Sequence, residues 1–435
     1  MSQIAVSAIS RLGDLISSSR VVTNAPSLAS YEVDGCLPSA ALLPSSSAEI
    51  AEILRFASAE GLAVIPTGGK THLGIGMPPR RYDLALDLSA MNRILAYEPH
   101  DLTLGIEPGI TCAELDRHLH AKGQFLPLAP SFSERATLGG AVAAPADTPF
   151  RYRYGTARDF LLGIEFVTGD GTISKSGGRV VKNVTGYDLH KLFVGSLGTL
   201  GVITRLNFRT FPLPQDHKMF LATFPDPAGV FDFCRAIAKS PLHPRLVEAF
   251  DPGTAALFAT CGSVSLNQDS WFAAVEADGP PAVLARHAHD FESMSKDAHS
   301  TGFIALDEHQ RNRLFASLSE FSAIAVAATP TTTIFRIPML PSAMPAMIAK
   351  VQGLAKDHGL ACASLIRALA VVYVALLPPI QPDAFASLLS ASRALFDLCV
   401  ASGATPVLEH SPLEMKRLVG VWPAPGNTHD IAQGL

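Results

Sequence analysis

Three glycine-rich stretches in the first half of the chain could hold a nucleotide through backbone groups. In the first, Val64-Ile65 is typical of a strand end and leads into Pro66-Thr67-Gly68-Gly69-Lys70-Thr71-His72-Leu73. The two glycines permit positive φ angles, so that successive N–H groups can point into one concavity. Such concavities bind anions, and this loop is therefore predicted to contact a diphosphate. The loop matches neither the Rossmann G-x-G-x-x-G motif nor the Walker G-x-x-x-x-G-K-[ST] motif.

The second and third stretches lie farther along the chain. Pro130 begins the second, which contains Thr137-Leu138-Gly139-Gly140-Ala141-Val142-Ala143, whose small side chains would let the main chain lie against a flat ring. Arg151 to Asp159, including Tyr154-Gly155, follows it. The third stretch ends in Gly195-Ser196-Leu197-Gly198-Thr199-Leu200-Gly201-Val202-Ile203. A glycine-dense turn that leads into a strand indicates close approach between backbone and ligand.

Side chains that could perform catalysis or bind a metal form no comparable pattern. His118 and His120, like His287 and His289, lie two residues apart in stretches predicted to be helical. Side chains at that spacing point away from each other, so no metal site is predicted and no catalytic residue is assigned. Three arginines in the second half could bind a carboxylate or serve only in packing or at the surface: Arg245, Arg336 and Arg367.

Composition excludes several classes of protein. A chain of 435 residues with 48% hydrophobic and 17% charged residues can bury a large core and is not intrinsically disordered. A net charge of -5 provides no basic field for nucleic acid. The longest apolar run, residues 368–377, is shorter than the roughly 20 residues of a membrane-spanning helix. The N-terminus has no signal-peptide pattern. The 6 cysteines form no C-x-x-C pair, which predicts a cytoplasmic protein without a cysteine-ligated iron–sulfur cluster.

Local patterns predict alternating helices and strands before residue 211. Apolar residues recur at helical spacing from Ile50 to Ala57, with Ser47 as the predicted N-cap. Gly169-Asp170-Gly171 predicts a hairpin between the strands on either side of it. Residues 202–209 alternate between apolar and polar, as in a half-buried strand.

A linker is predicted at residues 211–216, where prolines cluster and the composition changes. Beyond it, strands are predicted at 334–337, 362–366 and 371–376, with a helix at 342–358 between the first two. This order is typical of an antiparallel sheet covered by helices on one face.

Occurring together and in this order, the glycine-rich blocks resemble the FAD-binding domain of the vanillyl-alcohol-oxidase/PCMH flavoproteins. The runs Arg153-Tyr154-Gly155-Thr156-Ala157-Arg158-Asp159 and Gly177-Gly178-Arg179-Val180-Val181-Lys182-Asn183-Val184-Thr185-Gly186-Tyr187-Asp188-Leu189 are most similar to the FAD-binding E-type subunits of bacterial glycolate oxidases. The resemblance implies an α+β fold with a helical lead-in (1–35) and a PCMH-type FAD-binding domain of two α+β subdomains (36–214). An α+β antiparallel-sheet cap domain (215–410) and a segment returning towards the FAD domain (411–435) would follow.

The resemblance also implies roles for individual residues. Thr67 to Leu73 would surround the diphosphate, Thr137 to Ala143 would line the flavin and ribityl chain, and Gly201 to Ile203 would approach the adenosine end. Some superfamily members attach the flavin through a histidine, but His72 does not match their G-G-H pattern, so non-covalent FAD is expected. The full predicted FAD-binding set is Pro66, Thr67, Gly68, Gly69, Lys70, Thr71, His72, Leu73, Pro130, Thr137, Gly139, Gly140, Ala143, Tyr154, Gly155, Gly198, Gly201, Val202 and Ile203. Lys182, Asn183, Tyr187 and Asp188 either contact the cofactor or only support their loop.

Catalytic relatives carry a His-x-Gly-Asp-Gly-Asn-x-His metal segment followed by a Glu-His pair. Here Trp422 and Pro425 replace the first histidine and the aspartate of the fragment that ends in Gly426-Asn427-Thr428-His429. Glu409-His410 precedes the fragment, which reverses the order. The defective segment favours a relaying role for this flavin over direct contact with substrate.

The resemblance implies an FAD-binding subunit of a glycolate dehydrogenase (glycolate oxidase) complex, which oxidises a small 2-hydroxy acid to a 2-oxo acid. The implied partners are a catalytic FAD subunit and an iron–sulfur subunit that receives the electrons. Any membrane association would occur through these partners. Two alternatives remain open: a self-sufficient FAD-dependent 2-hydroxy-acid dehydrogenase, and a flavin-free assembly scaffold.

Overall fold

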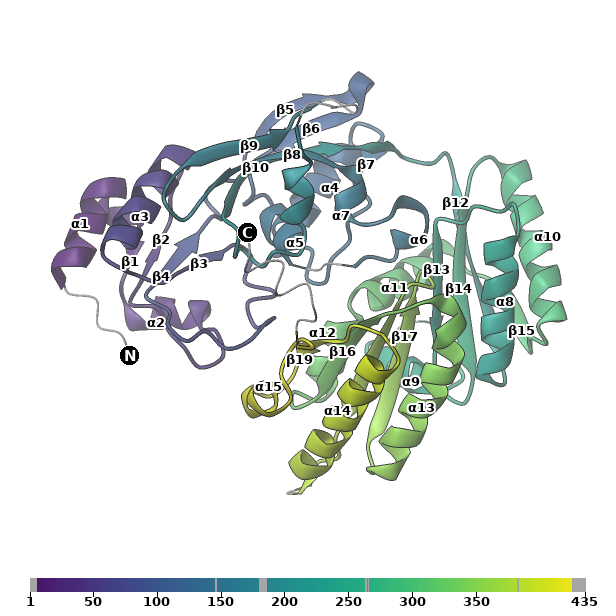
Figure 1. Cartoon of the computed structure of the whole chain (residues 1–435). Coiled ribbons are helices and arrows are strands. Elements are labelled where there is room, and N and C mark those ends of the chain that lie inside the picture. The colour runs from purple at the N-terminus through teal and green to yellow at the C-terminus, as the bar shows by residue number, and fades with distance from the viewer. Residues whose placement is uncertain are drawn as a thin grey trace. The chain divides into compact units, whose positions relative to one another are not determined.

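The computed structural model describes residues 6–144, 147–179, 186–262, 264, 266–381 and 383–424. The chain divides into two compact units, the first made of Met1–Gly74 and Pro78–Pro214 and the second of Ile75–Met77 and Gln215–Leu435. Their helices and strands are labelled in Figure 1. The division falls within the linker predicted at 211–216, although the first two residues of that linker form strand β11 (Phe211–Pro212), which pairs with β7 (Gln124–Phe125).

The first sheet of the first unit has the strand order β1-β2-β4-β3, and β2, β4 and β3 are parallel. Helix α3 (Ser47–Ala59) connects β2 to β3 and packs its apolar stripe against Leu84 and Leu86 of β4. Tyr31 and Ala85 belong to a second cluster that includes the alternate residues of the same strands. Both faces of this sheet are therefore buried, which explains its continuous apolar strands. The elements here are α1 (Val6–Ile16), η1 (Ser18–Arg20), β1 (Val21–Val22), α2 (Ala25–Leu28), η2 (Ala29–Tyr31), β2 (Ala40–Leu42), β3 (Val64–Thr67) and β4 (Leu84–Asp87).

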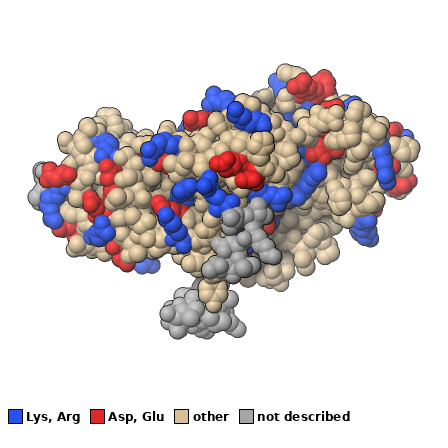
Figure 2. Space-filling model, turned by 90° about the horizontal axis from the view of Figure 1, so that it is seen from above, with Lys and Arg blue, Asp and Glu red and all other residues tan. Residues whose placement is uncertain are grey.

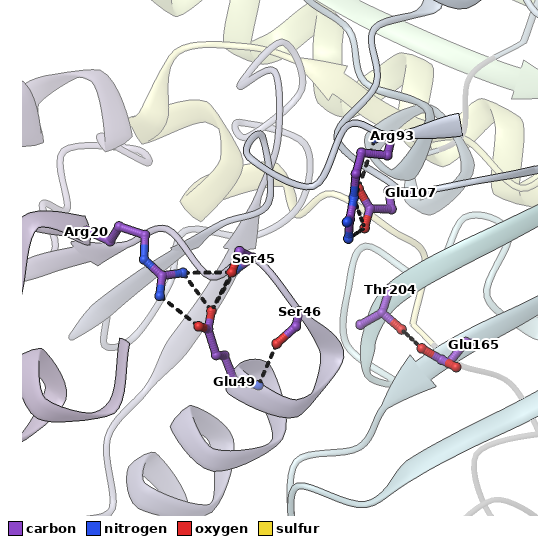
Figure 3. A network of polar contacts seen from close by, with 8 residues as sticks. All are labelled: Arg20, Ser45, Ser46, Glu49, Arg93, Glu107, Glu165 and Thr204. Carbon is purple, nitrogen blue, oxygen red and sulfur yellow. Dashed lines mark hydrogen bonds and ion pairs between the residues drawn. The ribbon is translucent and has the colours of Figure 1, made fainter. Parts of the chain in front are cut away.

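A polar network holds the start of α3 (Figure 3). Ser46, rather than the predicted Ser47, is the N-cap, and its hydroxyl accepts a hydrogen bond from the Glu49 N–H at 3.2 Å. Arg20 donates two hydrogen bonds of 2.7 Å to the Glu49 carboxylate. These bonds hold the pKa of Glu49 below its usual range and tie the segment before β1 to the first turn of α3. The N-cap prediction was wrong by one residue because Ser45, Ser46 and Ser47 are equivalent as sequence signals.

The second sheet of the first unit is antiparallel, with the order β5-β6-β10-β8-β9. The predicted hairpin is confirmed, since β8 and β9 pair from Gly163 opposite Gly177 to Val167 opposite Ile173. One face packs on α4, α5 and α7 through an apolar core that includes Phe208. The elements are β5 (Ile94–Glu98), η3 (Pro99–Asp101), β6 (Thr103–Ile106), α4 (Cys112–His120), α5 (Leu138–Ala143), α6 (Arg151–Tyr154), α7 (Ala157–Phe160), β8 (Leu161–Val167), β9 (Ile173–Gly177), η4 (Leu189–Leu192) and β10 (Val202–Arg209).

The central strand β10 is more buried than the half-buried strand predicted from its alternation. Leu206 and Phe208 enter the apolar core as expected. Asn207 alternates with them and so points to the opposite face, yet it is only 8% exposed. Polar residues on that second face therefore line a partly enclosed space and not an open surface.

The second unit contains an eight-stranded antiparallel sheet with the order β15-β12-β14-β13-β17-β18-β16-β19. Helices α9, α11 and α12 pack on one face through residues such as Phe258, Leu314 and Phe321. Helices α8, α10, α13 and α14 lie on the other face (Figure 1), where Phe291 of α10 meets Phe220 of β12 at a ring separation of 5.8 Å. The prediction that helices cover one face is therefore wrong. Helices α9 and α12 were missed because they are apolar on all sides and have no amphipathic period.

The second unit contains the helices and strands from β12 to α15. Its elements are β12 (His217–Phe224), α8 (Pro227–Lys239), β13 (Leu246–Phe250), α9 (Pro252–Thr260), β14 (Trp271–Asp278), α10 (Pro281–Asp297), β15 (Gly302–Ala305), α11 (Glu308–Ser319), α12 (Phe321–Ala328), β16 (Thr333–Pro338), η5 (Pro341–Ala343), α13 (Met344–Asp357), β17 (Ala361–Arg367), β18 (Val371–Leu377), α14 (Ala384–Ala401), β19 (Val407–His410) and α15 (Leu413–Val419). The strands and the helix predicted between residues 334 and 376 are confirmed as β16, α13, β17 and β18.

Among the helices that the structure describes, α14 alone is long and apolar enough to cross a membrane by length and composition. Leu388, Leu395 and Cys399 of this helix are buried, and it contacts α13, β16 and β18. Core helices pass the same length test, so this is weak evidence for a membrane span. On the face drawn in Figure 2, basic and acidic side chains are intermixed among the described residues.

Candidate functional site

The three glycine-rich stretches converge on one pocket in the first unit. One wall comes from the end of β3, a second from α5 and its N-cap Thr137, and a third from the loop before β10 and the start of that strand. The residues that line it are Pro66, Thr67, Gly68, Leu88, Pro108, Thr137, Gly139, Gly140, Ala143, Leu197, Gly198, Gly201, Val202 and Ile203. Eleven of these belong to the predicted FAD-binding set.

Backbone hydrogen bonds fix the three walls relative to one another. The Leu88 N–H donates to the Thr67 carbonyl at 2.9 Å, which joins the ends of β3 and β4. The Gly139 N–H donates to the Pro108 carbonyl at 2.8 Å, and the Leu197 N–H donates to the Ala143 carbonyl at 2.8 Å. The main chain around the pocket is thus held in place by the protein's own hydrogen bonds.

The lining fits a dinucleotide with apolar rings and polar connecting groups. Thr67 is only 3% exposed, and its Oγ1 has no hydrogen-bond partner among the described residues. Leaving a buried hydroxyl unpaired costs about 1–3 kcal/mol, so a ligand that pairs with it would recover this free energy. Val202 and Ile203 add apolar surface beside it. The pocket therefore has the chemistry that FAD requires.

A second hollow shares Pro66, Gly198, Gly201 and Val202 with this pocket. It extends along α3 and β3, and most of its other lining residues are apolar, as the adenine end of a dinucleotide would require. Those apolar residues are Leu54, Ala57, Leu62, Val64, Val167 and Leu200.

The glycines of the pocket serve two different purposes. A Cβ atom on Gly69 would lie 1.8 Å from the Arg135 carbonyl oxygen, and one on Gly68 would lie 2.3 Å from Thr137 Oγ1. These two glycines let the first loop pack against the second. A Cβ on Gly140 would meet only Thr137 Oγ1, at 3.2 Å, so the space beside Gly140 opens into the pocket. A bulky residue at Gly69 would therefore disturb the fold, and Gly140 is the better position for testing ligand binding.

The rest of the first loop is held by the protein and does not line the pocket. Lys70 has a positive φ of 57° and forms an ion pair with Asp87 at 3.2 Å, while its ammonium lies 3.7 Å from the Tyr31 ring centroid. Tyr31 donates a hydrogen bond of 2.7 Å to the same carboxylate. His72 shares a hydrogen bond of 2.9 Å with Thr71 Oγ1, and burial lowers the pKa of its imidazole.

Other members of the predicted set also lie outside the lining. Tyr154 packs edge-on against Phe125 and Phe211, with ring separations of 5.4 and 5.0 Å, which favours a structural role. Gly155 has a φ of 77°, where the chain turns into α7. The predicted residues that do not line the pocket are Gly69, Lys70, Thr71, His72, Leu73, Pro130, Tyr154 and Gly155.

Sequence reasoning missed three lining residues. Leu88 directly follows β4, and Pro108 lies just after β6, so proximity to the ends of these two strands is a signal that could have found them. Leu197 gave no such signal, because its unusual φ of 53° is visible only in the structure. Lys182 and Asn183 lie outside the described residues. Tyr187, which is described, is 90% exposed, and Asp188 forms an ion pair of 2.6 Å with Lys191.

In the second unit, two of the candidate arginines are paired internally. Arg245 forms an ion pair of 2.7 Å with Glu276, and Arg367 forms one of 3.2 Å with Glu248. All four side chains are at most 4% exposed. Both arginines are thus buried and already engaged by carboxylates, and Glu276 is also paired with Arg311 at 2.7 Å, so the hypothesis that Arg245 and Arg367 bind substrate is not supported.

No cluster of three or more histidine, cysteine or acidic side chains that could hold a metal occurs in the described parts of the chain. Glu409 and His410 lie at the end of β19. The fragment from Gly426 to His429 lies outside the residues that the structure describes.

Comparison with known families agrees with the pocket. Residues 38–177 match the family described as FAD binding domain, and residues 213–374 match FAD linked oxidases, C-terminal domain. The chain belongs to the FAD-linked oxidase flavoproteins. The family predicted from the glycine-rich blocks is thereby confirmed, as is FAD as the cofactor of its N-terminal domain.

Curated relatives extend the comparison. The chain is 30% identical to glycolate oxidase subunit GlcD of Bacillus subtilis over 299 residues, covering 68% of this chain and 63% of that one. It is 32% identical to the mitochondrial D-lactate dehydrogenase [cytochrome] of Arabidopsis thaliana, covering 49% and 38%. It is 30% identical to D-2-hydroxyglutarate dehydrogenase of Stutzerimonas stutzeri, covering 50% and 48%. The chain thus matches less than two thirds of the length of each relative. The resemblance to E-type subunits in particular stays a prediction.

Solved structures share the fold. Alkyldihydroxyacetonephosphate synthase superimposes with a TM-score of 0.74 at 17% identity, covering 92% of this chain and 81% of that one. p-Cresol methylhydroxylase with substrate bound superimposes with a TM-score of 0.76 at 16% identity, covering 95% and 90%. The α+β, PCMH-type fold predicted from the sequence is therefore confirmed.

Proposed function

We propose that this FAD-linked oxidase is the FAD-binding subunit of a glycolate dehydrogenase (glycolate oxidase) complex. It would take part in oxidation of a small 2-hydroxy acid to a 2-oxo acid, with the electrons passed to an iron–sulfur partner. The observation that carries the proposal is the convergence of three separated stretches on one pocket that contains the unpaired Thr67 hydroxyl. The similarity to a glycolate oxidase subunit and to two 2-hydroxy-acid dehydrogenases supports the choice of substrate class.

When bound, FAD would supply a group that accepts and passes on the electrons removed from the hydroxy acid. The residues of this chain would bind and orient that cofactor. Thr67 would hydrogen-bond to it, the backbone from Thr137 to Ala143 would lie along it, and Gly201 to Ile203 would approach its adenosine end. All the groups proposed to hold the cofactor lie in the first unit.

An accessory role in the complex is favoured over a self-sufficient enzyme. Oxidation of a hydroxy acid needs a cation for the carboxylate and a base for the hydroxyl proton. Arg245 and Arg367 are occupied by Glu276 and Glu248. We therefore propose that substrate reacts at a separate catalytic FAD subunit and that the flavin of this chain relays electrons. The complex would be cytoplasmic, or peripheral at the membrane through its partners.

The test begins with the colour of the purified full-length chain. Stoichiometric flavin absorbance that acid treatment releases into solution is expected for non-covalent FAD. A colourless chain that binds no added FAD, yet is required for activity of the complex, would identify the flavin-free scaffold and refute the proposal.

Anaerobic mixing with glycolate or D-lactate then separates the remaining alternatives. The flavin of the isolated chain should stay oxidised, and it should be reduced only after the catalytic and iron–sulfur subunits are added. Full reduction by either acid without partners would instead identify a self-sufficient dehydrogenase.

A further inference from the structure

A polar pocket lies on the face of the five-stranded sheet that points away from the apolar core. Strands β8, β9 and β10 contribute Glu165, Lys175, Arg205 and Asn207, and the chain after β9 contributes Arg179. The cavity volume is about 260 Å³. It lies just below the usual range of small-molecule sites, so the pocket has room for a small ligand only. None of its lining residues lines the flavin pocket.

The charges of this pocket are unbalanced. Glu165 is already satisfied, since it forms an ion pair of 3.3 Å with Lys175 and accepts a hydrogen bond of 3.0 Å from Thr204 (Figure 3). Arg179 and Arg205 form no ion pair with any described residue. Glu165 is therefore the one carboxylate among the described lining residues, against three cationic side chains, so the space has an excess of positive charge.

The floor of the pocket contains polar atoms that lack partners. Asn207 is only 8% exposed, and neither its Oδ1 nor Arg205 Nε has a hydrogen-bond partner among the described residues. A Cβ atom on Gly105 of the neighbouring strand β6 would lie 3.0 Å from Asn207 Oδ1 and 3.1 Å from Arg205 Nη2. Glycine at this position leaves room for both side chains to lie over the same part of the sheet. Buried polar atoms are almost always paired with protein, water or a ligand, so these two atoms are available to a ligand that enters the pocket.

We propose that this pocket is a second ligand site that binds a small anion carrying a hydroxyl group. Arg205 and Arg179 would donate hydrogen bonds to a phosphate or carboxylate, for which the planar guanidinium is well suited. The ligand hydroxyl would donate to Asn207 Oδ1, an acceptor that an anion alone could not satisfy. The site goes beyond the proposed redox function because none of these residues is assigned to the flavin.

The test is calorimetric titration of the full-length, FAD-saturated protein at low salt. Glycerol 3-phosphate should bind saturably and about fivefold more tightly than ethyl phosphate, which lacks the hydroxyls, because one hydrogen bond contributes about 1 kcal/mol. 3-Hydroxybutyrate serves as the carboxylate probe and shows which anionic group the arginines prefer. It is not a 2-hydroxy acid and so does not belong to the proposed substrate class.

Three variants assign the binding to this pocket. Arg205→Gln should weaken binding of glycerol 3-phosphate at least tenfold, as expected for loss of a charged hydrogen-bond donor. Asn207→Leu should abolish the preference over ethyl phosphate. Gly178→Glu should block binding, because a side chain there meets no atom of the described residues within 4 Å and would add a negative charge to the pocket. The matched control is Arg209→Gln, an exposed position on the same strand outside the pocket.

Two results would overturn the proposal. One is absence of saturable binding of all three probes at about 10 mM. The other is binding to Gly178→Glu, or to a flavin-retaining Arg205→Gln, that matches the Arg209→Gln control. Retained flavin absorbance identifies variants that are folded, and Gly178→Glu decides the question if Arg205→Gln does not fold. A Gly140→Leu variant should lose FAD and still bind glycerol 3-phosphate. Loss of glycerol 3-phosphate binding would therefore count against this second site, and retention of FAD would count against the flavin pocket.

Discussion

The side chain of Thr67 is almost fully buried, yet its hydroxyl has no partner among the described residues. If that hydroxyl bonds to FAD, Thr67→Val should weaken FAD binding about fivefold, since one hydrogen bond contributes about 1 kcal/mol. The flavin-free variant should be no less stable than the wild type, because the hydroxyl has no protein partner to lose. Dialysis followed by FAD titration measures the first effect and urea unfolding the second. Thr67→Ser, which keeps the hydroxyl, is the control. Equal FAD affinity of the valine and serine variants would show that the hydroxyl does not contact the cofactor.

Gly140 tests the volume of the same pocket. The space beside it contains no protein atom closer than Thr137 Oγ1, so Gly140→Leu should fill the pocket and not distort the loops. We expect at least a tenfold loss of FAD affinity with an unchanged far-UV circular dichroism spectrum. Gly353→Leu is the matched control, because that glycine lies on α13 and no atom of the described chain lies within 4 Å of its Cβ position. Stoichiometric flavin in purified Gly140→Leu would mean that FAD binds elsewhere.

At the scale of the element, helix α9 depends on a buried carboxylate at its N-cap. Asp251 Oδ1 accepts hydrogen bonds from the N–H groups of Thr254 at 2.8 Å and Ser364 at 2.9 Å. Burial raises the pKa of Asp251 to about 6, because desolvation outweighs these bonds. A carboxylic acid whose pKa is higher in the folded than in the unfolded state adds most to the free energy of unfolding at pH values below its unfolded-state pKa. This stabilisation is lost as the pH rises from about 4 to about 6.

Asp251→Asn should therefore stabilise the second unit at pH 8, since asparagine keeps an acceptor oxygen and carries no charge. The expected gain in free energy of unfolding is on the order of 2–3 kcal/mol, from about 1.4 kcal/mol per pKa unit. The gain should shrink towards pH 4, which urea unfolding at both pH values can measure. Asp226→Asn, at the exposed N-cap of α8, is the control. A gain of the same size at pH 4 and pH 8 would contradict the linkage.

The elements that the sequence predicted well have local signals. The turn at Gly169-Asp170-Gly171 and the apolar residues at helical spacing from Ile50 to Ala57 each specify geometry through residues close in sequence. The second layer of helices on the eight-stranded sheet was not predicted. Helices α9 and α12 are uniformly apolar, so only tertiary packing shows which side of each helix contacts the sheet. The ion-pair partners of Arg245 and Arg367 could not be predicted for a related reason. Glu276 lies 31 residues from Arg245 and Glu248 lies 119 residues from Arg367, so each pair forms only when the sheet is assembled.

At the scale of the whole molecule, the family could be identified from the order of the glycine-rich blocks, but the role of each residue could not. Eleven of the predicted FAD-binding residues line the pocket, and the others serve the loops around it. Gly69 and Gly140 illustrate the difference, since a glycine required for close packing between loops and one required for ligand space have the same appearance in a sequence.

The two units have separate cores, so their unfolding should respond to different changes. We expect two calorimetric transitions. FAD at 100 times its Kd should stabilise only the first unit, by about 2.7 kcal/mol. Arg367→Met should lower only the transition of the second unit, by about 3–5 kcal/mol, because Glu248 would lose its buried guanidinium partner. The control is Arg286→Met, which breaks an exposed pair with Asp290 on α10 and should cost less than about 1 kcal/mol. A single transition that both FAD and Arg367→Met displace would show that the two cores unfold as one cooperative system.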